Sequence, residues 1–177
     1  GIVEYAEGIE VGPGLEGGDM GPQVSEDELE TTLDYIEVAE DEGATLAAGG
    51  ERAADGSLGD GYFVEPTVFT EVEHDMRIAQ EEVFGPVLSV IRVDDFEEGV
   101  EVANGVQYGL SASVVTRDLG EANRFVDGVE AGMAKVNEKT TGVELHTPFG
   151  GFKRSSSETW REQGDAGLDF YTISKTV

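Results

Sequence analysis

The sequence of 177 residues contains no cysteine, five prolines, two histidines and 11 basic residues. Without cysteine the chain can form neither a disulfide nor a thiolate metal site, and it offers no cysteine nucleophile. The histidines, His74 and His146, lie far apart with no ligand spacing around them, so we expect no metal site. We find no apolar run of the length that spans a bilayer and no basic, apolar leader, so we expect a cytoplasmic protein with no membrane partner.

The shortage of basic residues is set against 38 acidic ones, which gives a formal net charge of −27. Such a surface repels other polyanions, so nucleic acid is not expected as a partner. An acidic disordered chain would fit this charge, but 38% hydrophobic residues and regular β-type runs favour a globular fold. The scattered acids resemble those of proteins from salt-loving microbes, where high salt screens the repulsion.

Helical and β-type patterns alternate along the chain and predict an α/β fold with a mainly parallel sheet and flanking helices. The expected helices cover residues 3–11, 25–42, 75–79, 95–104, 118–128 and 155–164. The expected strands cover residues 44–48, 62–70, 87–92, 110–116 and 133–137. We expect one domain over residues 1–167, followed by a separate terminal strand at 168–177.

One stretch, Gln80-Glu81-Glu82-Val83-Phe84-Gly85-Pro86, stands directly before a strand expected to be buried on both faces. The Gly-Pro pair gives that strand a sharp entrance, and α/β proteins bind ligands at the ends of strands. The carboxylate of Glu82 could accept both hydroxyls of a ribose, and Phe84 could pack against a flat cofactor group from the same side. The alternative is a simple turn with a solvated acid and a phenylalanine in the core.

Three motifs occur in a fixed order. The run from Gln80 to Val87 resembles the glutamate-phenylalanine-glycine-proline signature of the aldehyde dehydrogenase superfamily. Residues 103–112 and the turn Pro148-Phe149-Gly150-Gly151-Phe152-Lys153 resemble two further signatures of that family. The resemblance covers essentially the whole chain, as the C-terminal third of a member. Ser156 and Ser157 stand where many members have a glycine, which leaves the branch of the superfamily open.

The resemblance implies an enzyme that oxidises an aldehyde to a carboxylate through a cysteine thiolate, with NAD or NADP as cofactor. It assigns Glu82 to the hydroxyls of the nicotinamide ribose and places Phe84 beside it. The family's cysteine and general base both precede this region, so we expect no catalytic residue within the chain. A serine nucleophile near His146 is rejected, because no nucleophile-elbow sequence surrounds the serines.

The resemblance also identifies substrate-binding candidates. In relatives the loop at 139–143 and the ring of Phe149 line the aldehyde entrance, which singles out Thr141 and Phe149. This loop and residues 155–164 most resemble the branch that oxidises 2-oxoglutarate semialdehyde (2,5-dioxopentanoate). The alternative is that Thr140 and Thr141 only satisfy backbone groups of the loop.

The terminal run at 168–177 is rich in residues of high β-propensity. In the resembled family this strand joins a small oligomerisation sheet, which implies other subunits and the rest of the parent chain as partners. An ordinary edge strand of the same domain is the alternative. A second class of function also stays open, namely a non-catalytic acidic module that binds or assembles with a partner through this strand.

Overall fold

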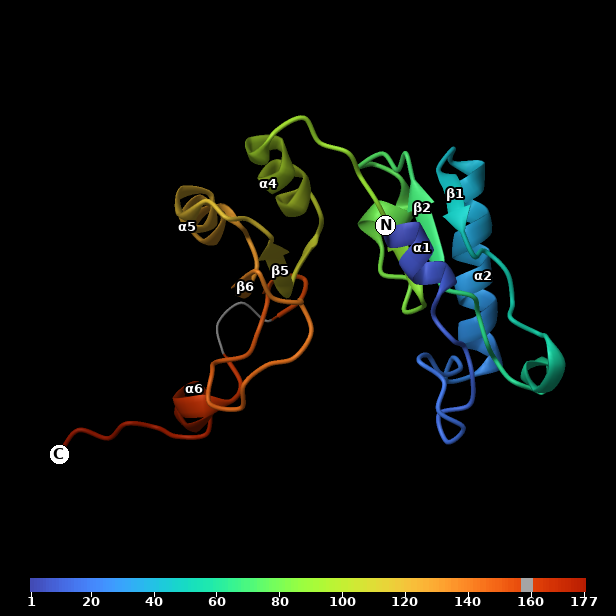
Figure 1. The fold of residues 1–177 in the computed structure, drawn as a ribbon. Helices are drawn as coiled ribbons and strands as arrows, with labels where there is room; N and C mark the ends of the chain where they lie inside the picture. The colour runs from blue at the N-terminus through green and yellow to red at the C-terminus, as the bar shows by residue number, and fades with distance from the viewer. Residues whose placement is uncertain (157–160) are drawn as a thin grey trace. The chain divides into compact units, whose positions relative to one another are not determined.

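The computed structural model describes residues 1–156 and 161–177. They form two compact units, Gly1–Arg92 and Val93–Val177 (Figure 1). The predicted α/β class is confirmed, because helices and strands alternate and each unit contains a parallel strand pair. The division after Arg92 lies inside the single domain predicted for residues 1–167, and the domain boundary predicted at 168 stays a prediction.

The first unit is built around a three-stranded sheet in the order β1-β2-β3. Strand β1 is antiparallel to β2, whereas β2 and β3 are parallel, so this sheet is mixed. The central strand β2 carries Thr67, Val68 and Phe69, all of them buried. In chain order the unit comprises α1 (Ile2–Glu7), α2 (Glu26–Asp41), β1 (Thr45–Ala48), the 3-10 helix η1 (Gly56–Asp60), β2 (Thr67–Thr70), α3 (Arg77–Gln80) and β3 (Val87–Ser89).

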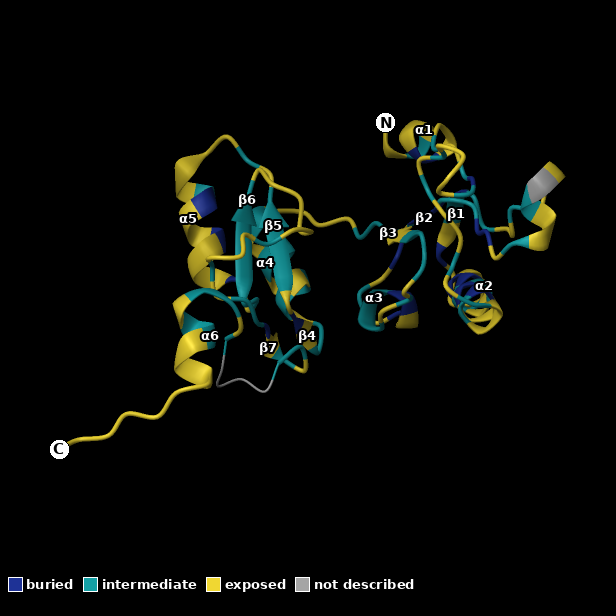
Figure 2. Cartoon of the chain, turned by 90° about the horizontal axis from the view of Figure 1, so that it is seen from below, coloured by how far each residue is buried: buried dark blue, intermediate teal, exposed yellow. Residues whose placement is uncertain are grey.

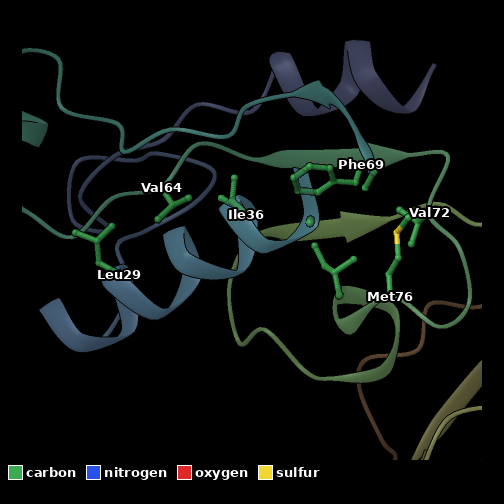
Figure 3. Packing of buried hydrophobic residues seen from close by; sticks show 9 residues of the cluster. Leu29, Ile36, Val64, Phe69, Val72 and Met76 are labelled. Carbon is green, nitrogen blue, oxygen red and sulfur yellow. The ribbon is translucent and has the colours of Figure 1, made fainter. Parts of the chain in front are cut away.

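Helix α2 covers one face of this sheet. It begins where the sequence predicted, because the hydroxyl oxygen of Ser25 accepts a hydrogen bond from the backbone N–H of Glu28 at 3.2 Å. Figure 3 shows Ile36 of α2 and Phe69 of β2 within the same apolar cluster. Burying each side chain of this size contributes about 1.5–3 kcal/mol to folding. The cluster therefore fixes α2 against β2, the strand that pairs with β3.

The second unit contains a parallel pair, β5 and β6, joined by helix α5 as the crossover. Strands β4 and β7 form a separate antiparallel pair. Asp95 and Asp118 accept hydrogen bonds from the backbone N–H groups of Glu98 and Glu121, which makes them the N-caps of α4 and α5. The elements are α4 (Phe96–Asn104), β4 (Tyr108–Gly109), β5 (Ser111–Val114), α5 (Leu119–Gly128), β6 (Met133–Val136), β7 (Phe152–Lys153) and α6 (Gly164–Phe170).

Two predictions near the end of the chain are wrong. Gly164 begins helix α6 instead of ending a helix, and residues 168–170 belong to α6 instead of opening a strand. A helix satisfies its backbone groups locally, whereas a strand needs a neighbouring strand to pair with, so helix formation overrides the β-propensity of this run. The helix predicted for 155–164 lies partly outside the described residues.

The last residues, 172–177, have no regular secondary structure and are drawn as exposed in Figure 2. Ile173 is 97% exposed, and no described strand pairs with this segment. The oligomerisation role predicted for 168–177 therefore stays a prediction, and residues 172–177 are the part of that run that follows the helix and turn.

Candidate functional site

Glu81 and Glu82 lie between α3 and β3 and have different surroundings. The backbone at Glu81 is extended, with φ −117° and ψ 152°, so neighbouring side chains point to opposite sides. The carboxylate of Glu81 accepts a hydrogen bond from the Tyr35 hydroxyl at 2.7 Å and forms an ion pair with Arg77 at 2.9 Å. Glu82 is exposed and has no hydrogen bond or ion pair within the described residues. Of the two acids, Glu82 is therefore the one available to an external ligand.

The surroundings of Glu81 also fix its protonation state. The guanidinium of Arg77 and then the hydroxyl of Tyr35 lower the pKa of Glu81 from its usual 4.5. The same hydrogen bond to Glu81 raises the pKa of Tyr35 above its usual 10.0. Glu81 is consequently ionised and Tyr35 protonated at neutral pH, which is the pairing that their hydrogen bond requires.

Phe84 is exposed and adopts an uncommon backbone conformation. Its side chain is 73% exposed, so the alternative of a phenylalanine in the core is wrong. Its φ is +55°, in the left-handed region that costs a residue other than glycine on the order of 1–3 kcal/mol. Contacts of the neighbouring residues must stabilise this backbone conformation. In this conformation the ring of Phe84 is exposed and can pack against a flat ligand group.

Gly85 and Pro86 anchor the segment after Phe84. A Cβ atom on Gly85 would lie 2.5 Å from the hydroxyl oxygen of Thr32, so only glycine fits against α2 here. The backbone N–H of Thr67 donates to the carbonyl of Pro86 at 2.8 Å, where β2 meets the start of β3. Between these anchors and Glu81 lie the free carboxylate of Glu82 and the exposed ring of Phe84.

Thr141 lies in the second unit, on the loop that follows β6. Side chains of the parallel strands hold this loop: the hydroxyl of Ser113 donates to the carbonyl of Glu138 at 2.6 Å, and that of Ser111 to the carbonyl of Thr140 at 3.0 Å. The ammonium of Lys135 donates to the carbonyl of Thr141 at 3.1 Å. Within the described residues the hydroxyl of Thr141 makes no hydrogen bond to loop backbone, which leaves it exposed and free.

Phe149 is half-buried in the same unit and does not share the surroundings of Thr141. Its backbone N–H donates to the carbonyl of Glu162 at 2.6 Å, and the reverse bond measures 2.7 Å. Phe149 lines a hollow of 580 Å³, and Thr141 is not among the residues around it. The residues lining this hollow include Leu110, Gly150, Ser155, Phe170 and Tyr171. The structure therefore brings Phe149 to a cavity but does not bring Thr141 to the same one.

The Gly-Gly turn beside Phe149 is needed for backbone packing. A Cβ on Gly132 would lie 1.7 Å from the carbonyl oxygen of Gly150, and one on Gly151 would lie 2.5 Å from the Cβ of Ser155. The chain segments approach too closely for any side chain at these positions. The turn therefore packs against neighbouring backbone and supplies no reactive group.

Sequence reasoning missed Tyr35, Arg77 and Lys135 as partners of the candidate residues. Glu81 follows Arg77 by four residues, from the start of α3 to the residue after its end, and this spacing was a visible signal for an ion pair. Tyr35 and Glu81 are 46 positions apart, and no local pattern links them. Over the part of the chain that the structure describes, no group of three acidic or histidine side chains could hold a metal ion, and no helix is long and apolar enough to cross a membrane.

Known proteins are similar to this chain in sequence and in fold. Residues 1–177 match the aldehyde dehydrogenase family. The chain is 70% identical, over 99% of its length, to an alpha-ketoglutarate semialdehyde dehydrogenase of Haloferax volcanii, of which it spans 36%. It is 47% identical, again over 99% of its length, to a 2,5-dioxopentanoate dehydrogenase of Saccharolobus solfataricus, of which it also spans 36%.

Solved structures give the same result. HpcC from Thermus thermophilus is 44% identical with a TM-score of 0.93, over 99% of this chain and 34% of that one. A betaine aldehyde dehydrogenase from Staphylococcus aureus, solved in complex with NAD+, is 37% identical with a TM-score of 0.93, over 98% of this chain and 34% of that one. The chain thus spans about a third of the length of these relatives. It belongs to the aldehyde dehydrogenase family.

Proposed function

We propose that this chain is the C-terminal portion of an aldehyde dehydrogenase that uses NAD or NADP to oxidise 2-oxoglutarate semialdehyde to a dicarboxylate. The observation that carries the proposal is the pairing of a free carboxylate on Glu82 with an exposed ring on Phe84, two residues later, in a chain 70% identical to an alpha-ketoglutarate semialdehyde dehydrogenase. The chain has no cysteine, so the nucleophile would come from the rest of the enzyme.

Glu82 would hold the nicotinamide ribose. An ionised carboxylate accepts two hydrogen bonds, and bonds to a charged acceptor are stronger than neutral ones. Phe84 would pack beside the same part of the cofactor and limit how far it can shift. The bound cofactor supplies the hydride acceptor. The contribution of this chain is therefore orientation, which matters because hydride transfer requires a near-attack geometry.

Thr141 and Phe149 would contact the aldehyde. The ring of Phe149 offers an apolar wall at the edge of a hollow, and the free hydroxyl of Thr141 can donate a hydrogen bond. The choice of substrate is supported by the similarity of the chain to an alpha-ketoglutarate semialdehyde dehydrogenase and a 2,5-dioxopentanoate dehydrogenase, at 70% and 47% identity. We also propose a cytoplasmic homo-oligomer adapted to high salt, in line with the net charge of −27 and the Haloferax relative.

The test of this proposal is Glu82→Gln in the complete enzyme. The amide keeps the size of the side chain but removes the charge, which should cost on the order of 1–3 kcal/mol in the transition state. This corresponds to a rate of hydride transfer about 5- to 150-fold lower in single-turnover experiments. Cofactor affinity should change less, because the rest of the cofactor site lies elsewhere.

Glu73→Gln is the matched control, because Glu73 is also exposed in the first unit and its side chain has no hydrogen bond or ion pair within the described residues. The control should behave as wild type. A Glu82→Gln enzyme with the wild-type rate of hydride transfer would remove Glu82 from the cofactor site.

A further inference from the structure

We propose that Tyr35 and Arg77 are positioning residues that hold Glu81 against helix α2 and so direct Glu82 toward the cofactor. This inference rests on the proposed function, because it concerns the geometry of the same ribose site. It concerns residues of the first unit alone.

The segment from Glu81 to Gly85 is fastened to α2 at both ends. At one end the carboxylate of Glu81 accepts from Tyr35, and at the other Gly85 lies against Thr32 with no room for a Cβ. Thr32 and Tyr35 are three residues apart, so they lie on the same face of α2. The segment from Glu81 to Gly85 therefore contacts helix α2 at both of its ends.

The direction of Glu82 follows from the direction of Glu81. In an extended backbone successive side chains alternate, so a Glu81 that points to α2 leaves Glu82 pointing away from it. Val83, the next residue on the side of Glu81, packs against the apolar cluster beneath α2. If Glu81 were released, the segment could turn about its axis and present either carboxylate to a ligand.

The hydroxyl of Tyr35 provides the directional contact in this arrangement. Arg77 and Glu81 are both well exposed, with side chains 51% and 39% accessible, and an exposed ion pair alone holds a side chain weakly. Tyr35 is half-buried, and its hydroxyl reaches the same carboxylate oxygen that Arg77 contacts. The guanidinium of Arg77 also lies 5.3 Å from the centre of the Tyr35 ring, which joins the three side chains into one network.

The start of α3 is tied to the same helix. The backbone N–H of Arg77 donates to the carboxylate of Glu42, the residue that follows α2, at 2.7 Å. The carbonyl of Arg77 in turn accepts from the N–H of Glu81 at 2.8 Å. Arg77 is thus fixed by its backbone as well as its side chain. Its contacts therefore position Glu81, the first residue after α3.

The test uses Tyr35→Phe and Glu81→Gln in the complete enzyme, singly and together, measured beside Glu82→Gln. Each single change should slow hydride transfer on the order of tenfold in single turnovers, because a small misplacement of the ribose disturbs the near-attack geometry. The dissociation constant of the cofactor should change by less than about threefold, since Glu82 itself is kept. The double variant should be no slower than the slower single variant, because both changes break the same contact.

The matched controls are Tyr5→Phe and Glu71→Gln. Tyr5 is 75% exposed, and Glu71 forms only a long, exposed ion pair with Arg92 at 3.7 Å. Both controls should keep the wild-type rate. A merely structural role for Tyr35 would lower the melting temperature while leaving the rate of hydride transfer per folded enzyme unchanged.

Two results would overturn the inference. Wild-type rates in Tyr35→Phe and Glu81→Gln, with a slow Glu82→Gln, would reject the positioning role and keep the proposed ribose site. Wild-type rates in all three variants would reject the ribose site as well as the positioning role. The two failures are therefore distinguishable within one set of measurements.

Discussion

Gly85 tests how closely the candidate segment packs on helix α2. In Gly85→Ala the new Cβ would lie 2.5 Å from the hydroxyl oxygen of Thr32 and 2.6 Å from its methyl carbon. Thr32 is fully buried, and its hydroxyl donates to the carbonyl of Glu28 at 2.9 Å, so it cannot rotate away without losing that bond. Overpacking of this kind costs about 1–3 kcal/mol. We expect a loss of stability in this range.

The assay is urea unfolding at high salt, followed by circular dichroism. Gly21→Ala is the control, because nothing lies within 4 Å of the Cβ it would add and its stability should be close to wild type. Thr32→Ala removes the two atoms nearest to the new Cβ and leaves only the Cβ of residue 32, at 3.2 Å. Gly85→Ala in that background should therefore cost at least about 1 kcal/mol less than in the wild type. Equal costs of Gly85→Ala in the two backgrounds would refute the contact between Gly85 and Thr32.

Three further predictions concern charge and the end of the chain. Because the pKa of Glu81 is lowered on folding, its contribution to stability is present above its unfolded value of 4.5 and is lost as the pH falls through the folded value. The loss of stability in Glu81→Gln should accordingly shrink below pH 4.5, and a constant loss down to acid pH would contradict the shift. The net charge of −27 makes the folded chain repel itself, and salt screens this repulsion. The melting temperature should therefore rise between 0.1 M and 1 M salt, where the Debye length falls from about 10 Å to about 3 Å. A melting temperature that does not change with salt would count against adaptation to salt. Deleting residues 172–177, which are exposed and lie beyond α6, should weaken self-association in sedimentation experiments, and an unchanged particle mass would exclude an intermolecular contact there.

Much of the fold could be predicted because its signals are local. The cap of Ser25 on Glu28, the apolar stripe of α2 and the β-type run at Val87 are each readable within a few residues, and the structure has these elements. The exposed position of Glu82 at the entrance to β3 also follows from the short motif around it. These features depend on periodicity and turn residues, which the sequence displays directly.

The remaining features depend on contacts between distant residues or on competition between structures. No pattern links Tyr35 to Glu81, or Lys135 to the loop at Thr141, because these hydrogen bonds arise only from packing. The run Leu168-Asp169-Phe170 has high β-propensity, yet it is helical, because a helix needs no partner strand to satisfy its backbone. The positive φ of Phe84 had no sequence signal either, since glycine is the residue that normally marks such positions.

The most direct test of the proposed function compares the complete protein with the 177-residue chain, both at high salt with 2-oxoglutarate semialdehyde and NAD or NADP. We predict that the complete protein forms NADH or NADPH and that this chain alone forms none, because it contains no cysteine. Reduction by the chain alone would contradict the proposal. A complete protein that neither binds nor reduces the cofactor would also contradict it, and would favour the non-catalytic acidic module instead.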